Sequence, residues 1–158
     1  MNDIIDNTYH KKINNIKELE LFLEETIANI PYCAPNNWET TTNEFINKGG
    51  LCNHFAQFLN NVLSENKQFK TIMIMGKAYN KIIEGRNYLL TNEFFNEPLS
   101  HVWNKFTYQE EEYICDPSTW GLHLTNNKKT MNLINWLKKH TLYKTSKGPG
   151  NLFEKYII

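Results

Sequence analysis

A glycine pair followed at once by a leucine, a cysteine and an amphipathic helical pattern constrains this chain more than any other feature. Gly49 and Gly50 precede Leu51, and apolar residues recur from there to Ser64 at the three- and four-residue spacings of one helix face. This pattern predicts a helix over 51–64 that begins directly after a flexible turn. Cys52 therefore falls in the first turn of the most clearly patterned helix of the chain.

Helical periodicity also occurs near both ends of the chain. A helix is predicted over about 13–29, and Ile30-Pro31 ends it because the residue before a proline avoids the helical region. Another helix is predicted near 128–140, ahead of a glycine-proline turn at 148–150. The polar stretch 31–48 contains two prolines and is expected to be irregular.

Strand patterns follow the cysteine helix. A buried strand is predicted over 70–79, and two alternating strands over 101–108 and 112–116 are expected to form a hairpin with the polar tip 109–111. Residues 80–100 show no clear period and are expected to form a long loop or a partly helical flap. Helices followed by strands indicate an α+β fold class.

Length and charge place the chain among ordinary globular domains. Its 158 residues fit a single domain spanning 1–158, with 41% hydrophobic and 22% charged residues. The 17 basic and 17 acidic side chains cancel, which argues against nucleic acid or a membrane surface as partner. No apolar run reaches the length of a signal peptide or of the roughly 18 residues of a membrane span. A soluble, cytoplasmic protein is expected, although delivery into another cell by a non-classical route stays open.

Three cysteines, Cys33, Cys52 and Cys115, match neither a disulfide framework nor a zinc-binding pair motif. A reducing compartment is the natural environment for them. Cys52 differs from the other two because the unpaired N–H groups of a helix N-terminus favour its thiolate, the form that acts as a nucleophile. The backbone around Gly50 could also bind an oxyanion. The competing interpretation is that Cys52 is a packed core residue, which is common for cysteine.

His101 and Asp116 supply partners for such a nucleophile. In a hairpin with an even-numbered tip, an odd residue of the first strand opposes an even residue of the second, so His101 and Asp116 would point to the same face at its open end. A carboxylate there orients the imidazole and stabilises the imidazolium, as in a catalytic triad. The same parity sends Cys115 into the core. His54 lies two residues after Cys52, faces another way on the helix and is not expected to be the base.

Three segments together resemble the transglutaminase-like superfamily, in particular its small microbial branch with an HAWN…DPTW-like signature. They are GGLCNHFAQFLNNVL around Cys52, SHVWN around His101 and EYICDPSTW around Asp116, and the resemblance covers roughly residues 45 to 120. It implies a papain-like core in which the nucleophile helix packs on an antiparallel sheet that carries His101 and Asp116. Ser118 departs from the commoner aspartate-proline-threonine order, a change expected not to touch the triad.

The resemblance also implies a reaction: acyl transfer through a thioester, from a protein or peptide amide to water or to an amine. No cofactor and no metal is implied, and neither the oligomeric state nor the identity of the substrate is indicated. Protease, amide hydrolase, deamidase and transglutaminase activities all fit. Trp38, Gly50 and Trp103 are the candidates for binding the oxyanion or positioning the substrate.

Other interpretations of the same residues remain open. GGLC also resembles the nucleophile motif of arylamine N-acetyltransferases, which are considerably longer proteins. The domain could instead be a non-catalytic binding module on the same fold. A metal site from Cys52, His54, His101 and Asp116 is also conceivable, but the first two diverge on their helix.

Overall fold

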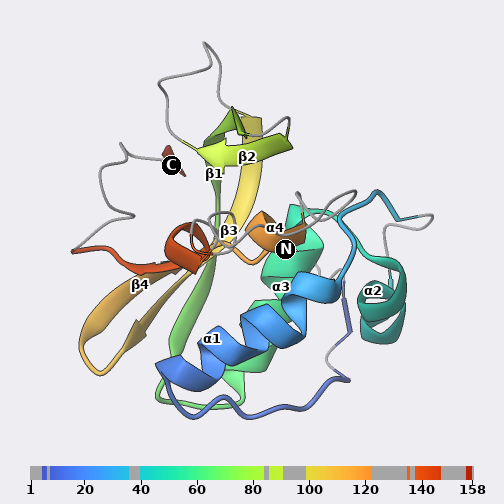
Figure 1. Cartoon of the computed structure of the whole chain (residues 1–158). Coiled ribbons are helices and arrows are strands. Elements are labelled where there is room, and N and C mark those ends of the chain that lie inside the picture. Colours follow the sequence, from blue (N-terminus) through green and yellow to red (C-terminus); the bar gives the residue numbers. More distant parts are fainter. Residues whose placement is uncertain are drawn as a thin grey trace.

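The computed structural model describes residues 5–6, 8–35, 40–83, 86–90, 99–121, 135, 138–146 and 156–157. In this part of the chain, helices pack against an antiparallel sheet, which confirms the predicted α+β class (Figure 1). None of the described helices is long and apolar enough to cross a membrane.

The first helical segment lies where the periodicity predicts it. Helix α1 spans Ile16–Glu25, and a 3-10 turn, η1, continues over Ile27–Asn29 before Pro31. The helix begins later than predicted because the side chain of Asn15 accepts a hydrogen bond from the Glu18 N–H, at 2.9 Å, and so caps it.

A second helix, α2, spans Thr42–Lys48, so the prediction that 31–48 is irregular is wrong in its second half. The side chain of Thr41 caps this helix by accepting the Glu44 N–H at 3.1 Å. Phe45 is fully buried and fixes the helix on the core. Residues 36–39 lie outside the described part of the chain.

The cysteine-bearing helix, α3, spans Cys52–Ser64 and confirms the strongest pattern in the sequence. Cys52 is its first residue. A short helix, α4, spans Ser118–Gly121 and begins two residues after Asp116. Residues 138–141 are helical, as predicted, but most of the predicted helix over 128–140 and the turn at 148–150 lie outside the described residues.

The described strands form an antiparallel sheet of order β2-β1-β3-β4-β5. The short strand β6 lies outside this order and pairs with β1. The two central strands are long, and the others are short. Their bounds are β1 Lys70–Ile83, β2 Arg86–Leu90, β3 Leu99–Tyr108, β4 Glu111–Cys115, β5 Leu142–Lys144 and β6 Tyr156–Ile157.

Two details of the sheet differ from the sequence prediction. Strand β1 continues past Tyr79 to Ile83 and pairs with β2, so part of 80–100 is a hairpin rather than a loop or a helical flap. The predicted tip between β3 and β4 shortens to Gln109 and Glu110, which both have positive φ. Such two-residue turns match the twist of paired strands.

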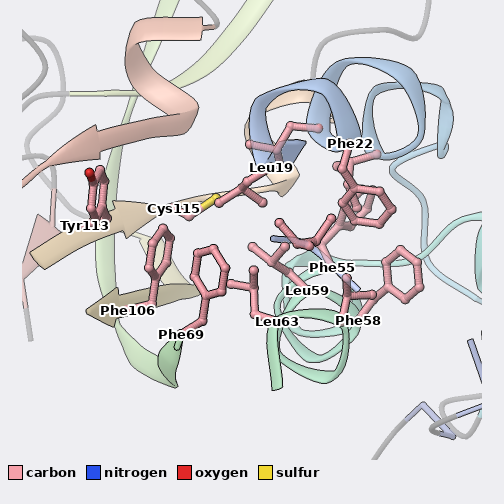
Figure 2. Close-up of a cluster of buried hydrophobic side chains, with 14 of the residues drawn as sticks. Leu19, Phe22, Phe55, Phe58, Leu59, Leu63, Phe69, Phe106, Tyr113 and Cys115 are labelled. Carbon is pink, nitrogen blue, oxygen red and sulfur yellow. The ribbon is translucent and has the colours of Figure 1, made fainter. Parts of the chain in front are cut away.

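The hydrophobic core lies between the helices and the sheet (Figure 2). Phenylalanines of α1 and α3 belong to the same buried cluster as aromatic residues of β3 and β4, where the Phe106 ring stacks on Tyr113 with centroids 5.0 Å apart. Cys115 is fully buried in this cluster, as strand parity predicts. Polar contacts also join the two layers: the Asn104 side-chain amide donates to the Ala56 carbonyl at 2.9 Å, and the Thr71 hydroxyl of β1 donates to the Asn60 side chain of α3 at 3.1 Å. The sheet and α3 are thereby fixed relative to each other.

Candidate active site

His101 and Asp116 form a buried pair at the edge of the sheet. The Nε2 atom of His101 lies 2.8 Å from Oδ2 of Asp116, and the two side chains are 3% and 0% exposed. Strand β4 pairs with β3 only as far as Asn104↔Cys115, so Asp116 has just left the sheet when it meets His101. The hairpin register therefore brings the two residues together, as predicted from parity.

Asp116 is held from several directions. Ser118 donates its hydroxyl to Oδ1 at 2.8 Å, while the Asp116 N–H donates to the Thr141 carbonyl at 2.8 Å. The Thr119 N–H donates to the Asp116 carbonyl at 3.1 Å, at the start of α4. The expectation that Ser118 does not touch the triad is wrong, since this serine fixes the carboxylate that faces His101.

Cys52 completes the group from the other side. Because Nε2 of His101 binds Asp116, the Nδ1 atom is the one left to face the Cys52 thiol, with which His101 forms a hydrogen bond. The backbone N–H of Val102 also donates to the sulfur. This N–H is available because β3 extends beyond the end of β4, so the thiol occupies a position that a neighbouring strand would otherwise fill. Cys52 itself is half-buried.

The surroundings favour an ion pair between thiol and imidazole. Burial alone disfavours the thiolate, but the hydrogen bond and positive charge of His101 and the Val102 N–H outweigh it and hold the pKa of Cys52 below its ordinary value. Burial also disfavours the imidazolium, yet the charge and hydrogen bond of Asp116, with those of Cys52, raise the pKa of His101 to about 9. A thiolate beside an imidazolium is the reactive state of a cysteine nucleophile.

The glycine pair allows close packing of the backbone around this site, rather than giving a substrate open access to it. Gly49 has φ +92, and a Cβ there would lie 2.1 Å from the Pro31 carbonyl oxygen. At Gly50 a Cβ would lie 2.7 Å from the His54 Cβ. The Gly50 N–H donates to the Pro31 carbonyl at 3.2 Å, so it is not available for the oxyanion role predicted for it.

The remaining predicted residues have different outcomes. Trp103 is 1% exposed and stacks on the His101 ring, with centroids 5.9 Å apart, so it supports the histidine rather than contacting a substrate. Trp38 lies outside the described residues. His54 is buried and accepts the Leu51 N–H on Nδ1 at 3.0 Å, which agrees with the prediction that it is not the base.

Tyr32 belongs to the site but was not predicted. It forms a parallel bridge with Gly50, through which the chain before α2 lies beside the start of α3. Its hydroxyl lies near the side chain and the backbone N–H of Cys52, and burial with the nearby Cys52 thiol raises the pKa of Tyr32. The sequence offers no local signal for this contact, because it depends on pairing between two irregular segments.

Comparison with protein-family models, with curated proteins and with solved structures finds no match to this chain. Among the described side chains, no cluster of three or more histidine, cysteine, aspartate or glutamate residues could hold a metal ion. The geometry of Cys52, His101 and Asp116 is therefore the observation from which a function can be argued.

Proposed function

We propose that this protein is a cysteine-dependent acyl-transfer enzyme with a transglutaminase-like, papain-like core, acting on a protein or peptide amide through a thioester. The observation that carries the proposal is the continuous chain of hydrogen bonds from Cys52 through His101 to the buried carboxylate of Asp116. A buried histidine that binds a carboxylate on one nitrogen and a helix-terminal thiol on the other has the arrangement of a triad.

The reaction follows from these contacts. The Cys52 thiolate attacks the amide carbon, and the carbonyl electron pair moves onto oxygen. The Nδ1 proton of His101 passes to the leaving nitrogen, the carbon–nitrogen bond breaks, and an amine departs. Water or a second amine then gives its proton to His101 as it attacks the thioester, which frees Cys52 again. Asp116 keeps the imidazole oriented and stabilises its cationic form throughout.

The proposal is tested by the pH dependence of iodoacetamide labelling at Cys52, read by mass spectrometry with the exposed Cys33 as internal reference. Because its pKa is lowered, Cys52 is expected to react well below the pH of about 8.5 at which a free cysteine ionises. His101 keeps its proton up to about pH 9, and a second change in rate is expected there.

Variants assign that behaviour to the triad. His101→Ala is expected to move the labelling of Cys52 to higher pH and to remove the change near pH 9, and Asp116→Asn to weaken both features. His10→Ala is the matched control, since His10 pairs with Glu65 on an exposed surface. If Cys52 reacted like Cys33 and ignored the loss of His101, the catalytic proposal would be wrong and a binding module would explain the fold better.

Turnover is measured on casein, an unfolded protein substrate, with Cys52→Ala as the blank. Three readouts separate the reactions open to a thioester: peptide cleavage on gels, ammonia release, and incorporation of a fluorescent primary amine. We expect at least one of them to depend on Cys52. Acetyl transfer from acetyl coenzyme A to an arylamine is assayed in parallel, and activity in that assay alone would favour the acetyltransferase interpretation instead.

A further inference from the structure

In an acyl-transfer site, hydrogen-bond donors stabilise the oxygen that becomes negatively charged, and the backbone of Cys52 supplies one such donor. The backbone N–H of Cys52 lies at the N-terminus of α3, where helical N–H groups have no partner within the helix. The Gly50 N–H is bound to the Pro31 carbonyl and points elsewhere. Among the described residues, the segment around Tyr32 packs beside the helix terminus and could supply a second donor.

Tyr32 is fixed at this position by its backbone and by its ring. The Cys33 N–H donates to the Gly50 carbonyl at 3.0 Å, and the Gly50 N–H donates to the Pro31 carbonyl. Both chain neighbours of Tyr32 are therefore hydrogen-bonded to Gly50, two residues before Cys52. The ring stacks on Phe55, with centroids 5.9 Å apart and planes 23° apart. Phe55 is fully buried in the first turn of α3, so the ring lies along this turn.

The hydroxyl of Tyr32 consequently meets the reacting atoms. It lies near the side chain and the backbone N–H of Cys52, and its contacts with both act on its pKa. Burial, together with the nearby charges of Cys52 and Asp116, raises the pKa of Tyr32, so the phenol keeps its proton and remains a donor at all working pH values. The hydroxyl can donate a hydrogen bond to a thiolate and, once the negative charge moves to a substrate oxygen, to that oxygen.

We infer that Tyr32 is a catalytic residue, the second oxyanion donor of this site, acting beside the backbone N–H of Cys52. This inference rests on the proposed function. As the sulfur–carbon bond forms and the carbonyl pair moves to oxygen, that oxygen accepts hydrogen bonds from the Cys52 N–H and the Tyr32 hydroxyl, and neither donor gives up its proton. Since the Tyr32 bridge to Gly50 and the stacking of its ring on Phe55 hold this residue beside the first turn of α3, an oxygen formed next to the sulfur can contact both donors.

The test compares two reagents on Tyr32→Phe, which removes only the hydroxyl. Acetylation of Cys52 by 4-nitrophenyl acetate passes through an oxyanion and is followed by nitrophenolate release and by the mass of the acetylated protein. Iodoacetamide reacts at a saturated carbon and forms no oxyanion. Loss of one oxyanion donor costs roughly 10²- to 10³-fold with natural substrates, so a decrease of at least about tenfold in acetylation is expected, with alkylation changed less than about threefold.

Tyr108→Phe is the matched control, because it also removes a phenol that hydrogen-bonds, to the Asn14 carbonyl, in the core away from the site. Both variants are checked by circular dichroism and thermal unfolding. Equal acetylation by wild type and Tyr32→Phe would overturn the inference. An equal decrease in the reaction rate of Cys52 with both reagents would also overturn it, because Tyr32 would then act on the thiol alone. A faster reaction with both reagents would overturn it as well, because it would show that the hydroxyl obstructs the site.

Failure of the inference differs from failure of the proposed function. If Cys52 of the wild-type protein were acetylated no faster than Cys33, the acyl-transfer proposal itself would be wrong. Tyr32 would then have no oxyanion to bind. If wild type were acetylated rapidly at Cys52 and this depended on His101 but not on Tyr32, the triad would stand and the second donor would have to be another group.

Discussion

At the scale of single residues, the carboxylate of Asp116 depends on Ser118 as much as on its histidine partner. One oxygen binds His101 and the other accepts the Ser118 hydroxyl, and all three side chains are buried. A carboxylate with only one of these bonds could turn away from the imidazole. The serine therefore acts on the reaction through the orientation of Asp116 and is a positioning residue.

We predict that Ser118→Ala lowers the free energy of unfolding by about 1–3 kcal/mol, the cost of removing one hydrogen bond to a buried carboxylate. Cys52 labelling should also lose part of its low-pH reactivity, because His101 is less firmly held. Urea denaturation and the iodoacetamide profile measure the two effects. Ser64→Ala is the control, since Ser64 donates to Asn60 on an exposed helix face. A Ser118→Ala protein as stable and as reactive as wild type would show that the second bond is dispensable.

At the scale of secondary-structure elements, the sequence predicts those with a strong local period and misses those held by tertiary contacts. Helix α3 and the β3–β4 hairpin have apolar residues at regular spacing, and parity within the hairpin was enough to pair His101 with Asp116. Helix α2 is short, and its signals are a cap at Thr41 and a single fully buried phenylalanine, Phe45. The contact of Tyr32 with Cys52 has no periodic signal at all, because a bridge between irregular segments creates it.

The junction between α2 and α3 is the element whose geometry the site most depends on. Gly49 ends α2 with φ +92, a conformation that side chains rarely adopt, and its Cα faces the Pro31 carbonyl. We predict that Gly49→Ala destabilises the protein by more than about 2 kcal/mol, from backbone strain and from the clash with Pro31. It should also slow acetylation of Cys52, because the neighbouring Tyr32–Gly50 bridge must shift.

Thr41→Ala provides the comparison for Gly49→Ala. It removes only the cap of α2 and should cost about 1 kcal/mol without changing the reactivity of Cys52. Thermal unfolding and acetylation rates of the two variants measure the difference. A Gly49→Ala protein with the small, purely thermodynamic effect expected of Thr41→Ala would mean that the junction does not position the site.

At the scale of the whole molecule, the site exists only while α3 and the sheet keep their relative position. Cys52 comes from the helix, His101 from strand β3 and Asp116 from the position directly after strand β4. The aromatic core between the layers supplies most of the adhesion, but apolar packing is not directional (Figure 2). The buried hydrogen bond from Asn104 to the Ala56 carbonyl is directional and lies one helical turn from Cys52. It fixes the register between the layers next to the site.

We predict that Asn104→Ala reduces the free energy of unfolding by about 1–3 kcal/mol and, in the protein that remains folded, slows labelling of Cys52 at neutral pH. Asn47→Ala on exposed α2 should change stability by less than about 0.5 kcal/mol and leave labelling unaltered.

In wild type, fast labelling and circular dichroism should be lost in one urea transition, because both need the two layers together. Fast labelling that survives loss of the Asn104 contact would instead show that the hydrogen bonds among Cys52, His101 and Tyr32 hold the site locally.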